Sequence, residues 1–167
     1  MRNIAFILLF TPFLGLCQEK KTDSASINKI VAKIDKLSKT NSRSFIKNKI
    51  INHTKIKEDW QYFNNKRFSR IMINYTIDST AYSVAYTEKY YFKDSSLIYA
   101  YESEIFFSPA EGIKQGTKWS GDFYFSEGKL IIHVTNGLGR SELDDWDPEN
   151  EILQRLKKRK AELKLLK

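Results

Sequence analysis

Residues 68–77 read FSRIMINYTI, and this stretch decides the fold class of the chain. Large apolar side chains occupy every second position from Ile71 to Ile77. Because successive side chains of a strand point to opposite faces of a sheet, a period of two predicts a half-buried β-strand. One predicted face consists of Ile71, Ile73, Tyr75 and Ile77, and the other of Arg70, Met72, Asn74 and Thr76.

The same alternation continues in four more segments, which are residues 82–92, 97–107, 123–125 and 130–134. Short polar turns separate several of them, and this spacing is typical of an antiparallel meander. The sequence therefore predicts a curved antiparallel meander of five strands. In the third segment the pattern places Leu97, Tyr99, Tyr101, Ile105 and Phe107 on one face, with Ala100, Glu102 and Glu104 on the other.

Two stretches of this region resemble each other at an offset of 33 residues. Residues 91–98 read YFKDSSLI and residues 124–131 read YFSEGKLI, so both have the pattern Y-F-x4-L-I. Each copy contains the end of a strand, a tight polar turn and the start of the next strand. Two copies are fewer than a solenoid needs, and we interpret them as two similar hairpins of one sheet.

A helix is predicted on each side of the sheet region. The first has an apolar stripe at helical spacing, with Ser24 or Ser26 as the N-cap and Asn41 at its end. The last begins with Asp147 as the N-cap and Pro148 at the first helical position. The two stripes are Ile27, Ile30, Val31, Ile34 and Leu37 in the first helix, and Ile152, Leu156, Leu163 and Leu166 in the last.

Residues 42–67 show no clean period, and for them we expect a second short helix followed by a loop. The predicted fold class is α+β, with an N-terminal helix, the five-strand meander and a basic amphipathic C-terminal helix. These elements form one domain over residues 18–167. About 150 residues are enough to bury a core without disulfides, and Cys17 is the only cysteine.

Residues 1–17 have the order of a secretory signal peptide. Arg2 precedes an uncharged apolar run, and charges return only at Glu19. Cleavage after Cys17 leaves Gln18 as the new N-terminus and gives an exported protein, either periplasmic or secreted. The alternative is a lipoprotein anchored through Cys17, and Leu16 argues against it because such signals have a small residue at that position.

Charge is distributed unevenly along the chain. Residues 18–67 carry 13 basic and 5 acidic side chains, residues 68–153 carry 7 and 14, and residues 154–167 carry 7 and 1. Basic ends alone would suggest nucleic acid or anionic membranes as partners. Because the middle is acidic, we favour basic helices that lie against an acidic sheet.

No metal or cofactor site is predicted. The acids Asp145, Asp147, Glu149 and Glu151 superficially match the odd-numbered ligands of a calcium loop. That loop needs a glycine where Asn150 stands and a glutamate where Leu156 stands. Helix capping explains the same acids without a metal ion.

No catalytic site is predicted either. His53 and His133 have no partner that the sequence identifies, and a general base must be held in place by one. Glu88, Glu102 and Glu104 could form a carboxylate pair on neighbouring strands, but spacing alone does not bring them together. The sequence therefore favours a non-catalytic protein.

Eight of the nine tyrosines fall in predicted strands. Most share a face with Ile, Val or Leu, so we expect them to pack in the core. The alternative is a concave aromatic face that holds a ligand. Nucleic acid is disfavoured as that ligand, because the net negative charge of residues 68–153 repels phosphates.

The apolar leader, the remainder rich in Lys, Ile and Asn, and the paired Y-F-x4-L-I hairpins resemble small exported bacterial proteins of no established activity. The resemblance implies no catalytic residue. A helix followed by a curved meander is also similar to cystatin-like and NTF2-like folds, which is an analogy of fold alone.

We therefore expect a non-catalytic binding or accessory protein of the cell envelope, whose partner is a protein or a small ligand. Two alternatives remain open. The basic helix Ile152–Lys167 could hold the chain on an anionic membrane surface, or the chain could be a small secreted hydrolase.

The mass of the exported protein tests the expected leader. Cleavage after Cys17 predicts an unmodified chain that begins at Gln18, which intact-mass spectrometry measures directly. A diacylglyceryl adduct on Cys17 would instead establish the lipid anchor.

Overall fold

The computed structural model describes residues 23–51, 54–79, 82–107 and 117–166. These residues form an N-terminal helix, seven consecutive strands, a short 3-10 helix and a C-terminal helix. The elements are α1 (Ser24–Asn41), β1 (Arg43–Ile51), β2 (Thr54–Asn64), β3 (Phe68–Asp78), β4 (Ser83–Lys93), β5 (Ser96–Phe107), β6 (Thr117–Ser126), β7 (Lys129–Asn136), η2 (Arg140–Glu142) and α2 (Pro148–Leu166).

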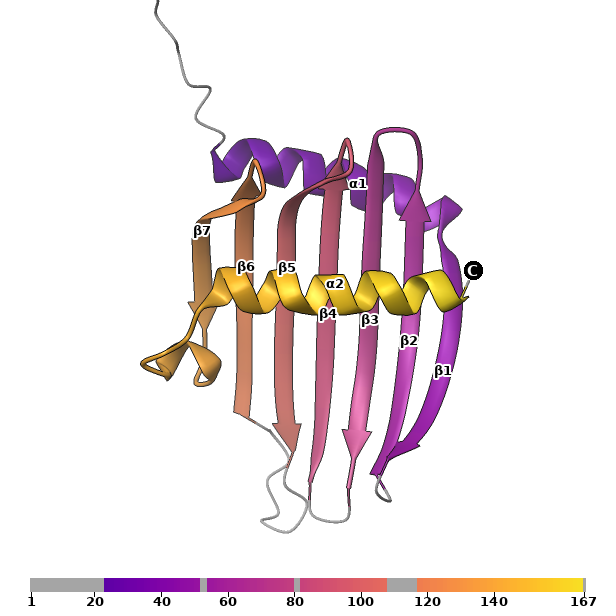
Figure 1. Ribbon diagram of the computed structural model, residues 1–167, viewed down its shortest axis with the longest axis vertical. Coiled ribbons are helices and arrows are strands. Elements are labelled where there is room, and N and C mark those ends of the chain that lie inside the picture. The colour runs from indigo at the N-terminus through magenta and orange to yellow at the C-terminus, as the bar shows by residue number, and fades with distance from the viewer. Residues whose placement is uncertain (1–22, 52–53, 80–81, 108–116, 167) are drawn as a thin grey trace, which may run out of the picture.

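The strands form one antiparallel sheet in sequence order, and the two helices cover opposite faces of it. Helix α2 crosses the middle of one face, while α1 runs behind the strands near one end of the sheet (Figure 1). The core is accordingly divided into two clusters. The α2 cluster contains Trp60, Ile73, Tyr90, Phe123, Phe125 and Ile152, and the α1 cluster contains Ile27, Ile34, Phe63, Tyr91, Tyr99 and Tyr124.

The expectation of α+β architecture, with an N-terminal helix, an antiparallel sheet and a C-terminal helix in that order, is confirmed, but the predicted number of strands is wrong. The error lies in residues 42–67, where we expected a short helix and a loop. These residues form β1 and β2 instead. The sheet therefore has seven strands, not five.

The period of two in β1 and β2 is hidden by residues that contradict ordinary patterning. Ile46 and Ile50 lie on the face of β1 that is turned away from α2, and they are 65% and 74% exposed. In β2 the carboxylate of Glu58 occupies an inward position next to Trp60 and is 4% exposed. Because apolar residues point outward and a charged one inward, hydrophobic alternation alone cannot identify these strands.

The interpretation of the Y-F-x4-L-I repeats as two hairpins is confirmed. Both have a two-residue turn with positive φ at each central residue, which a type I′ turn requires. The φ angles are 49° at Asp94, 69° at Ser95, 52° at Glu127 and 82° at Gly128. Both hairpins also shift register after the tyrosine, at Tyr91/Phe92 and at Tyr124/Phe125.

These register shifts correct the predicted faces of the third segment. Tyr91 pairs with Tyr99 and Phe92 with Leu97, so Ile98 is an extra residue in β5. Leu97 therefore packs in the α2 cluster, whereas Tyr99 packs in the α1 cluster. The face with Ala100 and Glu102 is buried under α2.

The helix boundaries agree with the sequence with one exception. Asp147 caps α2 by accepting a hydrogen bond from the amide of Asn150 at 3.1 Å. The N-cap of α1 is Asp23, which accepts from Ser26 N at 2.6 Å, so the predictions of Ser24 and Ser26 are wrong. Neither helix is long and apolar enough to cross a membrane.

The structure does not confirm the expected fold analogies, and it does not describe the expected signal peptide. The cystatin-like and NTF2-like analogies are not confirmed, since the sheet has seven strands in sequence order and a helix on each face. The expected signal peptide, residues 1–17, lies outside the described residues, as does His53.

Two glycines with the same backbone conformation allow a matched test of the packing between β6 and the loop after β7. Gly137 and Gly128 have φ angles of 84° and 82°. A Cβ on Gly137 would lie 1.8 Å from the carbonyl oxygen of Lys118, whereas a Cβ on Gly128 meets nothing within 4 Å. We predict that Gly137→Ala lowers the free energy of unfolding by about 2–4 kcal/mol and Gly128→Ala by about 1 kcal/mol, measured by urea denaturation. Equal losses would show that only backbone strain matters.

Candidate binding cleft beside the C-terminal helix

Three glutamates lie buried on the sheet face that α2 covers. Glu58 of β2 is 4% exposed, and Glu88 of β4 and Glu102 of β5 are each 2% exposed. Glu88 and Glu102 are direct cross-strand partners, so their charges would repel each other without compensation. Carboxylates at such depth require positive partners, and these come from outside the sheet.

Helix α2 supplies two of these partners. Arg159 donates from Nε and Nη2 to the two oxygens of Glu88, each at 2.8 Å. Arg155 forms an ion pair with Glu102 at 2.5 Å. Our expectation that basic helices lie against an acidic sheet is thus confirmed for α2.

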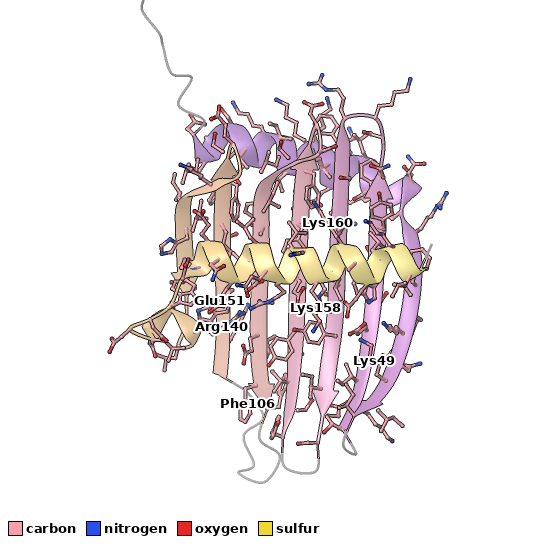
Figure 2. The ribbon with its side chains drawn as sticks, viewed as in Figure 1. Lys49, Phe106, Arg140, Glu151, Lys158 and Lys160 are labelled. Atoms are coloured by element: carbon pink, nitrogen blue, oxygen red, sulfur yellow. The ribbon has the colours of Figure 1, made fainter. Side chains whose placement is uncertain are left out.

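A third partner comes from the turn η2. Arg140 donates from Nη2 to Glu102 at 3.0 Å and from Nη1 to Glu151 of α2 at 3.4 Å. Figure 2 shows Arg140 and Glu151 beside each other at the N-terminal half of α2. The guanidinium of Arg140 also lies 4.6 Å from the ring centroid of Trp119. This residue therefore ties η2 to both β5 and α2.

Glu58 and its neighbours extend the network to the edge of the sheet. Lys49 of β1 donates to Glu58 at 3.0 Å, and Trp60 Nε1 donates to it at 3.1 Å. Arg159 approaches the same carboxylate to 3.8 Å. The chain of charges thus runs from β1 to η2 under α2.

Burial and pairing shift the pKa values of these acids in different directions. Burial by itself raises the pKa of Glu58, but hydrogen bonds from Trp60 and Lys49 outweigh it and hold that pKa below its ordinary value. Burial raises the pKa of Glu102, and Arg155 and Arg140 oppose this rise without cancelling it. Ionised Glu58 therefore contributes stability that is lost as pH falls through its lowered pKa. Protonated Glu102 contributes stability that is lost as pH rises through its raised pKa.

A cleft lies next to this network. The neighbouring row of the sheet runs from Tyr75 through Tyr86 and Glu104 to Trp119, each residue paired directly with the next. The rings of Tyr75 and Tyr86 stack with centroids 4.7 Å apart and planes 12° apart. Three residues of this row, Tyr75, Tyr86 and Glu104, line a cleft of about 280 Å³, and its other walls include Glu88, Glu102, Arg140 and Arg155.

Arg140 and Glu104 also line a second, adjoining cavity of about 230 Å³, with Phe106, Trp119, Leu138 and Gly139. Phe106 lies on the part of the sheet that α2 leaves uncovered (Figure 2). Burial at this corner leaves the Nε atom of Arg140 without a hydrogen-bond partner among the described residues. The cleft thus combines aromatic faces with closely packed charged groups.

The structure brings together two of the three glutamates that the sequence singled out as a potential pair, Glu88 and Glu102, and places Glu104 one row away on the same face. Sequence reasoning missed Glu58, Arg140, Arg155 and Arg159. One signal could have identified Arg159, because it follows Leu156 by three residues and precedes Leu163 by four, within the apolar stripe of α2.

The other sequence candidates lie elsewhere. His133 pairs across the sheet with Phe123, and its ring is 5.5 Å from that of Trp146. The acids of the calcium-like run have structural contacts: Asp147 caps α2, and Glu149 accepts from the amide of Leu130 at 2.9 Å. Among the described residues no group of acids, histidines or cysteines is arranged to hold a metal ion.

The expectation that most of these tyrosines pack in the core is confirmed. Tyr90, Tyr91, Tyr99 and Tyr124 are buried, and Tyr75 and Tyr101 are partly buried against the α2 and α1 clusters. Tyr75 also lines the cleft with Tyr86, and Tyr82 is 40% exposed and stacks on Phe106. The sequence could not distinguish the buried tyrosines from the others, because the positions of the two helices decide which tyrosines are covered.

Comparison of the chain with known protein families, with curated proteins and with solved structures finds no match.

The Arg159–Glu88 pair is expected to hold α2 on the sheet. We predict that Arg159→Met lowers the free energy of unfolding by about 3–5 kcal/mol, because it leaves Glu88 charged and buried. The exposed neighbour Lys158 is the control, and Lys158→Met should change stability by about 0.5 kcal/mol or less, measured by urea denaturation.

The double variant Arg159→Met with Glu88→Gln should be more stable than Arg159→Met alone, since no unpaired charge then remains. Losses of equal size in Arg159→Met and Lys158→Met would contradict the assigned contact.

Proposed function

We propose that this chain is a non-catalytic binding protein of the cell envelope, and that a small ligand occupies the cleft beside α2. The observation that carries the proposal is the cleft itself, where stacked Tyr75 and Tyr86 face a charged corner made by Arg140, Arg155 and Glu104. Ligand sites typically combine apolar or aromatic walls with a few fixed polar groups.

The buried charges of the network favour binding over catalysis. A general base or acid must be free to exchange a proton with the substrate. Glu88 and Glu102 are instead held by Arg159, Arg155 and Arg140. Such pairing fixes the geometry of these two side chains, which suits a preorganised binding site.

The envelope location rests on the leader at residues 1–17, whose apolar run and following charges are those expected for export. The third hypothesis, a small secreted hydrolase, has less support. His133 packs beside Trp146 and Phe123, and no carboxylate is recorded within hydrogen-bonding distance of it in the described ranges.

Helix α2 gives less support to the membrane-surface alternative than its sequence does. Its apolar residues Ile152, Leu156 and Leu163 are buried against the sheet, so they are not available to enter a lipid surface. Two of its basic side chains, Arg155 and Arg159, are turned to buried glutamates. Its exposed lysines, such as Lys157 and Lys158, are accompanied by one strongly exposed apolar side chain, that of Leu165.

Thermal unfolding in the presence of fractionated small molecules from the native envelope tests the proposal. We expect one fraction to raise the Tm of the wild-type protein by several degrees, because a ligand that binds only the folded state stabilises it. The variant Tyr86→Leu should lose this response, while the control Tyr82→Leu, outside the cleft, should keep it. A protein that no fraction stabilises, or a Tyr86→Leu variant that responds fully, would contradict the proposed site.

A further inference from the structure

We propose that the corner of this cleft formed by Tyr86 and Glu104 binds the ammonium group of a small organic amine. The inference rests on the proposed function, since it names the class of ligand that the cleft takes. It is based on the aromatic stack, on the environment of Glu104 and on the balance of charge around the cleft.

The stack of Tyr75 and Tyr86 already holds a cation of the protein on one of its two members. The guanidinium of Arg159 lies 5.1 Å from the ring centroid of Tyr75. Cations favour this position because the face of an aromatic ring carries partial negative charge. Among the described residues, no cation lies over the ring of Tyr86, although this ring is the other member of the stack.

Strand pairing places a carboxylate next to Tyr86, on the side away from Tyr75. The two rings are nearly parallel and stack from β3 to β4, so the outer face of Tyr86 is turned toward β5. Its direct partner there is Glu104, and partners in such pairs have Cβ atoms about 4.5–5.5 Å apart. A ligand ammonium over the ring would therefore lie next to an opposite charge.

Glu104 differs from the buried glutamates of the same face. Glu58, Glu88 and Glu102 each have an ion pair with a lysine or arginine. For Glu104 no ion pair is recorded within residues 23–51, 54–79, 82–107 and 117–166, and it lines both cavities of the site. Burial and the charge of Glu104 raise the pKa of Tyr86, although Arg140 and Arg155 oppose the rise, which agrees with a carboxylate beside the ring.

The charge balance of the region also favours a cation. The network and the cleft contain two more acidic than basic side chains among the described residues, although the whole chain has a net charge of +8. An anionic ligand would meet this local excess unfavourably. The acids are Glu58, Glu88, Glu102, Glu104, Glu151 and Glu162, and the bases are Lys49, Arg140, Arg155 and Arg159.

Three probes that differ in charge but have the same carbon chain test the inference: butylamine, 1-butanol and butyrate. Each is titrated into protein produced with its own leader, so that any processing is retained, and binding is followed by NMR chemical shifts. We expect butylamine to bind at least about tenfold more tightly than the other two, with the largest shifts at Tyr86 and Glu104.

Matched variants identify the groups responsible. Glu104→Gln should weaken butylamine binding by about tenfold, and Tyr86→Leu by about three- to tenfold. The control Glu142→Gln makes the same change at an exposed residue of η2 and should leave the affinity unchanged. Chemical shifts of the variants without ligand verify that each remains folded.

Equal binding of the three probes, a preference for butyrate, or full affinity in Glu104→Gln would overturn the inference. If an envelope fraction stabilises the protein through Tyr86 but its ligand is not an amine, the inference is wrong while the proposed function stands. If neither the fractions nor the probes bind at this cleft, both are wrong.

Discussion

The bidentate ion pair between Arg159 and Glu88 joins α2 to the centre of the sheet, and much of the architecture depends on it. Both groups are taken out of water, so each is costly unless the other is in place. Apolar contacts of Ile152, Leu156 and Leu163 drive the helix onto the sheet but do not fix its position along the strands. The ion pair does, because its geometry is satisfied at one position only.

The position of α2 in turn creates the cleft. The helix crosses the middle of the sheet. It does not cover Tyr75, Tyr86 and Glu104 completely, so these residues line a cleft beside it. Arg155 and Arg140 then close the corner by sharing Glu102. A site built in this way is preorganised, since its charged groups are already held by other contacts before a ligand arrives.

The face under α1 is organised differently. Two of its buried tyrosines donate their hydroxyl groups to acids: Tyr91 donates to Asp35 of α1 at 2.9 Å, and Tyr99 donates to Asp122. Arg70 also pairs with Asp35, at 2.8 Å. In each hairpin the Tyr and the Phe are neighbours in one strand, so Tyr91 and Tyr124 lie on this face and Phe92 and Phe125 on the other. Both hairpins also contain the same register shift, so the repeated sequence corresponds to a repeated structure.

The sequence by itself determined the meander from Phe68 onward, both helices and the two hairpins, because these depend on local periodicity, capping and turn residues. It failed at β1 and β2, where Ile46 points to solvent and Glu58 to the core, since only contacts with other elements make that arrangement stable. The cleft was decided by the tertiary structure alone. Glu88, Glu102, Arg140 and Arg159 come from separate elements, and no local pattern specifies which strands pair or where a helix lies across them.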